Sequence, residues 1–101
     1  MTGRKDSQTV DKPAMEYLEG EFMLLMGDVL KHGEKKYGGE NWKQPPLCSK
    51  DYKGARLRHA FQEGPDSVTA IDHLVHEAVN CMMEWWHRKH GPESKDFYIS
   101  W

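Results

Sequence analysis

The stretch TAIDHLVHEAVNCMMEWWHRK, residues 69–89, decides the fold that the sequence predicts. At 3.6 residues per turn it forms a helix with two chemically distinct faces. One face is apolar and is predicted to pack in the core: Ile71, Leu74, Val75, Ala78, Val79, Met82, Trp85 and Trp86. The other carries imidazoles, a carboxamide and two carboxylates: His73, His76, Glu77, Asn80, Glu84 and His87. A merely solvated face is typically rich in Lys/Glu pairs. This face has no Lys or Arg before Arg88, and its groups are of the kind that hold a ligand in a defined orientation.

Two more helices are predicted ahead of this one. The first begins near Pro13, with Asp11 as a plausible cap, and its apolar stripe runs from Met15 to Leu30 before a stop at Gly33. The second covers about residues 50–63, with Ser49 as its N-cap.

The ends of the third helix also have sequence signals. Thr69 and Asp72 fit a capping box, and His90-Gly91-Pro92 is a typical C-terminal stop. The expected fold is therefore all-α, a three-helix domain over residues 13–91. Residues 1–12 read as a flexible arm, and residues 92–101 as an aromatic tail that docks on the core or on another subunit. Three helices cover so many aromatic residues poorly, so we expect a homo-oligomer that completes a larger bundle.

The bulk composition excludes several classes. A length of 101 residues suits one domain, and a net charge of −2 does not favour binding to DNA or RNA polymers. No apolar run approaches the roughly 20 residues that span a bilayer, and the N-terminus lacks a secretory signal, so we expect no membrane partner and a cytoplasmic location. Cys48 and Cys81 lack metal or redox spacing and are expected to be free thiols.

The loop predicted over residues 33–48 carries two large aromatic side chains, Tyr37 and Trp42. Long loops with aromatic residues are often functional. Equally, the two rings can simply close the end of the helical bundle.

Metal binding has weak support. His73 and His76 share a helix face, but Asn80 stands where a zincin motif has its second histidine, so a dedicated transition-metal site is not favoured. Mg²⁺, which prefers oxygen ligands, has four weak candidates: Glu16, Glu19, Asp66 and Glu77. Neither cysteine nor any serine has the surroundings of a catalytic nucleophile.

Nucleotide binding has better support from residue types. Phosphate groups suit the basic residues spread over three segments: Lys35, Lys36, Arg56, Arg58, His59, His73 and His76. Tyr37 and Trp42 offer flat faces for a base, and Asn80 offers a paired donor and acceptor.

Three segments also resemble a known family. KKYGGENWK (35–43), RH (58–59) and DSVTAIDHLVHEAVN (66–80) are similar to motifs of the bacteriophage dATP/dGTP diphosphohydrolase N-terminal-like family. The resemblance implies an all-α phage-type protein that handles purine deoxynucleotides, with kinship to the Mg²⁺-dependent all-α pyrophosphohydrolases of the MazG type. The matched positions are Lys36, Tyr37, Gly38, Asn41, Trp42, Arg58, His59, Asp66, His73, His76 and Asn80.

The departures from the family pattern bear on activity. Val68 stands where the family has Glu, and Ala70 where it has Gly. The acidic signature of the pyrophosphohydrolases is also incomplete in this chain, which has only Glu16-x-x-Glu19 and Glu77-x-x-Asn80. Cleavage of a phosphoanhydride relies on a metal that neutralises phosphate and activates water.

Three functions follow from these patterns. The leading one is a protein that captures and sequesters a nucleotide, such as a host defence signalling nucleotide, with little or no hydrolysis. The second is a Mg²⁺-dependent dATP/dGTP pyrophosphohydrolase acting on the nucleotide pool of an infected host cell. The third is a helical protein-interaction module whose polar face is only solvated or satisfied by internal hydrogen bonds. The expected ligand-binding residues are Lys36, Tyr37, Asn41, Trp42, Arg58, His59, His73, His76 and Asn80; the catalytic residues stay open.

Overall fold

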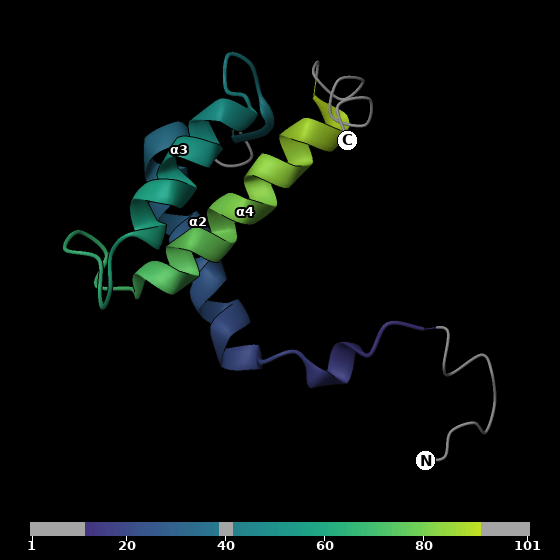
Figure 1. The fold of residues 1–101 in the computed structure, drawn as a ribbon, viewed down its shortest axis with the longest axis vertical. Helices are drawn as coiled ribbons and strands as arrows, with labels where there is room; N and C mark the ends of the chain where they lie inside the picture. Colours follow the sequence, from purple (N-terminus) through teal and green to yellow (C-terminus); the bar gives the residue numbers. More distant parts are fainter. Residues whose placement is uncertain (1–11, 39–41, 92–101) are drawn as a thin grey trace.

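A computed structural model describes residues 12–38 and 42–91 of the chain (Figure 1). These residues form a short 3₁₀ turn, η1 (Met15–Tyr17), and three α-helices, α2 (Gly20–Tyr37), α3 (Ser49–Ala60) and α4 (His73–His90). Within the described ranges there is no strand, only an isolated bridge between Pro65 and Asp72. The all-α, three-helix prediction is confirmed. Most of the predicted arm (1–11) and the aromatic tail (92–101) lie outside the described residues.

The most extensive packing in the fold is between α3 and α4, and α2 packs on α4 to a smaller extent. In Figure 1 the segment that contains η1 extends away from the three helices. The core draws one residue from α2, one from α3 and the rest from α4 and its approach: Val29, Tyr52, Ile71, Val75, Val79 and Met83. The helix at 73–90 is thus the element on which the other two assemble.

The first helix lies later in the chain than the sequence predicts. Leu18 and Glu19 are extended, with ψ angles of 141° and 113°, and this break separates η1 from α2. The helix continues through Gly33 because no residue there terminates it, and it ends instead at Gly38. Gly38 has φ 79° and donates its N–H to the Glu34 carbonyl, which is a glycine C-cap.

The N-termini of the other two helices also differ from the prediction by a few residues. Cys48, not Ser49, precedes α3, and its N–H donates to the Asp51 carboxylate at 3.0 Å. The N-cap of α4 is Asp72, whose side chain accepts the Leu74 N–H at 2.8 Å. Thr69 does not take part in a capping box, because residues 64–72 form a compact loop ahead of the helix. The predicted C-terminal stop at Gly91 is confirmed.

The main correction concerns which face of α4 is buried. Two members of the predicted apolar stripe, Leu74 and Trp85, are 65% and 50% exposed. Ile71, Val75 and Val79 of this stripe are buried as predicted, but nearly the whole polar face is buried as well: His73, His76, Asn80, Glu84 and His87. α3 and the loops cover this side, and polar partners from these segments form hydrogen bonds with His73, His76, Glu84 and His87.

Two smaller points complete the description. Cys48 and Cys81 are free thiols, as expected. Among the helices in the described ranges, none combines the length and the apolar character needed to cross a membrane.

Candidate functional site

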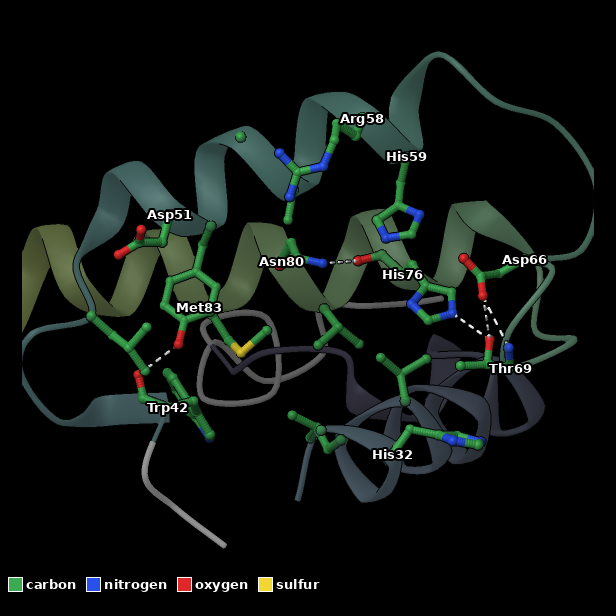
Figure 2. Close-up of a pocket in the computed structure, with 18 of the residues that line it drawn as sticks. His32, Trp42, Asp51, Arg58, His59, Asp66, Thr69, His76, Asn80 and Met83 are labelled. Atoms are coloured by element: carbon green, nitrogen blue, oxygen red, sulfur yellow. Dashed lines mark hydrogen bonds between the residues drawn. The ribbon is translucent and has the colours of Figure 1, made fainter. Parts of the chain in front are cut away.

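A pocket of about 720 Å³ lies between α2, α3 and α4 (Figure 2). Five of the ligand-binding residues predicted from the sequence line it, namely Trp42, Arg58, His59, His76 and Asn80. They come from the loop before α3, from the end of α3 and from the buried polar face of α4. The polar face that singled out the α4 sequence is thus one wall of a cavity.

Three imidazoles gather at one end of the pocket. His59 on α3 faces His73 on α4, with 2.8 Å between their Nδ1 atoms. The same ring stacks on His76, with centroids 4.6 Å apart and planes 15° from parallel. His73 does not line the pocket; it is buried behind His59.

The surroundings of His59 and His76 favour the neutral form of these two rings. Burial lowers the pKa of His59 below its ordinary value of 6.5, and the neighbouring His76 and His73 lower it further. Burial also lowers the pKa of His76, although the Asp66 carboxylate opposes that shift. Neutral imidazoles keep a lone pair, so these groups can accept a hydrogen bond or bind a metal ion.

Asp66 is held by the loop that leads into α4. Its Oδ1 accepts the N–H groups of Val68 and Thr69, at 2.8 and 2.9 Å, and lies 3.4 Å from the Thr69 hydroxyl. The backbone hydrogen bonds, that of Thr69 first, lower the pKa of this carboxyl. The same Thr69 hydroxyl lies 2.7 Å from His76 Nε2, so a hydrogen bond joins the loop to the imidazole that stacks on His59.

One residue of this loop has an unusual backbone conformation. Ala70 has φ 64°, in the left-handed region that glycine favours, and it is the only non-glycine residue with positive φ in the described ranges. The family has glycine at this position.

Arg58 provides a fixed positive charge in the pocket. Figure 2 shows its side chain lying between α3 and α4, above Asn80. A Cβ placed on Gly54 would lie only 3.3 Å from Arg58 Nη1, so the absence of a side chain at Gly54 leaves room for the guanidinium. Lys50, about two turns before Arg58 on α3, adds a second cation to the lining.

Asn80 has one hydrogen bond within its own helix. Its Nδ2 donates to the His76 carbonyl at 2.8 Å, which fixes the carboxamide orientation. Its Oδ1 has no partner among the described residues, and the side chain is only 8% exposed. A buried acceptor that lines a cavity is a natural contact for the N–H edge of a ligand.

Trp42 packs between the loop and the helices and also borders the pocket. Its carbonyl accepts hydrogen bonds from the Tyr52 hydroxyl, at 2.9 Å, and from His87 Nε2, at 2.7 Å. Its ring packs edge-on against Tyr52 and Trp86. The residue anchors the loop to both helices and also lines the pocket.

Several predicted residues are not brought to this site. The side chains of Lys36 and Tyr37, and all of Asn41, lie outside what the structure describes. Glu16 and Glu19 are exposed on the N-terminal segment. Glu77, on α4, does not line the pocket.

A carboxylate Mg²⁺ site is therefore not assembled by the described residues. Of the four weak candidates only Asp66 lies at the pocket, and Asp51 is the one further carboxylate in its lining. Asp51 already accepts the Cys48 N–H. Val68, which replaces the family's Glu, also lines the pocket, so the carboxylate missing from the sequence motif is missing at the cavity.

Sequence reasoning missed several contributors. His32 reaches the pocket from α2, and Thr69 joins Asp66 to His76. Thr69 lies inside the matched motif between Asp66 and His73, which is the one signal that pointed to it; nothing in the sequence singles out His32.

Comparison with known families supports this reading of the motifs. The family described as dATP/dGTP diphosphohydrolase, N-terminal, matches residues 2–97. That range is nearly the whole chain, so the chain belongs to this family, as its motifs indicate. No curated protein and no solved structure matches the sequence.

Proposed function

We propose that this member of the dATP/dGTP diphosphohydrolase N-terminal family binds a purine nucleotide in the pocket between α2, α3 and α4. The observation that carries the proposal is the buried polar face of α4, where His76 and Asn80 face the same cavity as Arg58. Burying polar groups costs free energy unless they are hydrogen-bonded. A cavity that keeps such groups at its wall is suited to a polar ligand.

The residues that line the pocket suit two chemically different parts of one ligand. Arg58 and Lys50 suit phosphate oxygens, Arg58 through a bidentate fork and Lys50 as a point charge. The Asn80 Oδ1 atom suits an N–H group on the edge of a base, and the Trp42 ring offers an apolar surface beside it. A purine nucleotide combines these features, and purine deoxynucleotides are named by the family description.

Binding with little or no hydrolysis is the form of this function that we favour. Phosphoanhydride cleavage by a Mg²⁺-dependent enzyme needs carboxylates that hold the metal beside the phosphates. Asp51 and Asp66 are the carboxylates in the lining, and both accept backbone N–H groups. Such a pocket is better equipped to retain a nucleotide than to cleave it, which fits sequestration of a signalling nucleotide.

Hydrolysis of dATP or dGTP is the second candidate, and the family match favours it. The protein-interaction alternative has less support, because the α4 polar face is buried against α3 and the pocket instead of being solvated.

One incubation separates these functions. Purified protein is mixed with Mg²⁺ and a panel of dATP, dGTP, cyclic dinucleotides and ADP-ribose-type nucleotides. Chromatography is then run on the filtrate and on the supernatant of heat-denatured protein. Sequestration predicts a nucleotide that leaves the filtrate and returns intact after denaturation. Release of monophosphate and pyrophosphate identifies the hydrolase, and no loss of any nucleotide contradicts both.

A further inference from the structure

We propose that His59, Asp66 and His73 bind one divalent transition-metal ion at the wall of the pocket. The three side chains come from α3, from the loop ahead of α4 and from the first residue of α4. One ligand atom of each lies within 4.8 Å of the corresponding atoms of the other two. The histidine pair that the sequence spacing suggested, His73 with His76, is not the pair that converges.

The donor set determines the class of ion. Two imidazole nitrogens and one carboxylate oxygen form the two-histidine, one-carboxylate set that suits first-row transition ions and leaves coordination positions open. Mg²⁺ prefers oxygen ligands throughout, so this site differs from the carboxylate site expected of a pyrophosphohydrolase.

The nitrogen atoms of the two histidines lie close enough together to bind the same ion. Metal–nitrogen bonds of about 2.0–2.1 Å place adjacent ligand atoms about 2.9 Å apart in an octahedron and about 3.3 Å apart in a tetrahedron. The Nδ1 atoms of His59 and His73 are 2.8 Å apart. Without metal, one proton lies between these two nitrogen atoms in a hydrogen bond. The His59 ring borders the cavity, and a small rotation of this ring lets an ion replace that proton.

The carboxylate is already oriented. The Oδ1 atom of Asp66 is held by the backbone N–H groups of Val68 and Thr69, whereas its Oδ2 atom has no hydrogen-bond partner in the described ranges. Outer groups that fix a ligand in this way strengthen metal binding. The Thr69 hydroxyl extends the same support to His76, which stacks on His59.

The open side of the site faces the nucleotide pocket. His59 and Asp66 line that pocket and His73 lies behind them, so an ion held by all three presents its free positions to the cavity. Phosphate oxygens of a bound nucleotide are suitable ligands for those positions. This last step rests on the proposed function, whereas binding of the ion does not.

Calorimetry on the full chain tests the metal site. The protein is made without a polyhistidine tag, freed of metal with EDTA, and titrated with CoCl₂, MnCl₂ or MgCl₂ in the absence of nucleotide. We expect one Co²⁺ or Mn²⁺ ion per chain and much weaker binding of Mg²⁺. Asp66→Asn and His59→Gln should each weaken Co²⁺ binding by at least about 10-fold. His90→Gln, at the exposed end of α4, is the matched control and should not change it.

The outcomes are distinct. Absence of saturable Co²⁺ binding, or binding that is unchanged in both variants, overturns the site. Melting curves of the metal-free variants show whether each is folded, and His59→Gln, at a half-buried position, serves if Asp66→Asn unfolds. Nucleotide binding by EDTA-treated protein is measured separately. Metal binding without nucleotide binding overturns only the proposed function, and the reverse result overturns only the metal site.

Discussion

At the scale of single residues, a glycine in the middle of α3 lies beside the Arg58 side chain at the pocket. Gly54 weakens α3 relative to alanine, because glycine loses more backbone entropy on folding. In return, the Arg58 guanidinium lies against the bare backbone, where a Cβ would approach within 3.3 Å. Stability and the placement of a charged ligand group are in conflict at this position.

Gly54→Ala should therefore have opposite effects on stability and binding. We expect the free energy of unfolding to rise by about 0.5–1 kcal/mol from helix propensity. The end of the Arg58 guanidinium must move by a few tenths of an ångström to clear the new Cβ, which should weaken nucleotide binding by about 2- to 3-fold, or roughly 0.5 kcal/mol. Urea denaturation and titration calorimetry measure the two quantities. Gly27→Ala in α2, where a Cβ meets no atom within 4 Å, is the control and should stabilise without loss of affinity; equal affinities of the Gly54 and Gly27 variants would contradict the role of Arg58.

At the scale of the elements, the loop at residues 64–72 determines where Asp66 lies. The Asp66 N–H donates to the Ile71 carbonyl at 2.9 Å, and the His73 N–H donates to the Gly64 carbonyl at the same distance. Closing these bonds over so few residues places Ala70 in the left-handed region. Such strain persists only where the surrounding contacts impose it, and it is common beside functional groups.

Ala70→Gly should relieve that strain. The left-handed conformation costs about 1–2 kcal/mol for a residue with a Cβ. Glycine removes this cost but loses more backbone entropy on folding than alanine does, so we expect the free energy of unfolding to rise by about 0.5–1 kcal/mol. Thermal and urea unfolding measure it. Ala60→Gly, at a helical position of α3, should instead destabilise the protein. If both substitutions destabilise to a similar extent, the backbone conformation described for Ala70 is wrong.

The contact between α3 and α4 includes a buried ionic group. Glu84, 6% exposed, pairs with Arg56 of α3 and, at 3.2 Å, with Arg88 of its own helix. Glu84→Ala should lower the free energy of unfolding by about 2–3 kcal/mol, because two half-buried guanidinium groups lose their counter-charge. Urea denaturation tests this. Glu34→Ala removes an exposed pair with Lys31 and should change stability by less than about 0.5 kcal/mol; a loss as small at Glu84 would show that the buried pair contributes little.

The elements also show where prediction from sequence succeeds. The 3.6-residue period and the Gly91 stop predict α4 well, because they depend on local chemistry. Periodicity does not tell which polar residues find partners. His87 is buried because the Trp42 carbonyl, 45 residues away, accepts its hydrogen bond, and Glu84 because Arg56 meets it. The motif residues Arg58, His59, His76 and Asn80 line one pocket, whereas the pairing of His73 with His59 depends on how α3 packs against α4.

At the scale of the whole molecule, α4 has an apolar stripe that the other described residues leave largely uncovered. Leu74, Ala78, Cys81 and Trp85 follow one another at steps of four, three and four residues, which is the spacing of the contact seam in two-helix coiled coils. Leu74 and Trp85 are largely exposed. We propose that a second copy of the chain covers this stripe and completes a larger helical bundle.

A symmetric dimer should have twice the chain mass of 11.8 kDa in multi-angle light scattering. Leu74→Glu and Trp85→Glu should each produce a monomer with unchanged helix content, because they place a charge in the seam. Phe61→Glu, at a side chain 86% exposed just beyond α3, is the control and should stay dimeric. A wild-type protein that is monomeric at high concentration, or a dimer insensitive to both seam variants, would contradict this arrangement.

The central claim is that the buried polar face of α4 forms one wall of a nucleotide pocket. The most direct measurement is a map of NMR amide and imidazole chemical-shift changes as dGTP or dATP is added to EDTA-treated protein. Binding in the pocket predicts saturable changes centred on Arg58, His59, Thr69, His76 and Asn80, with little change at Leu74 and Trp85. Changes confined to the exposed stripe, or none at saturating nucleotide, would contradict the claim.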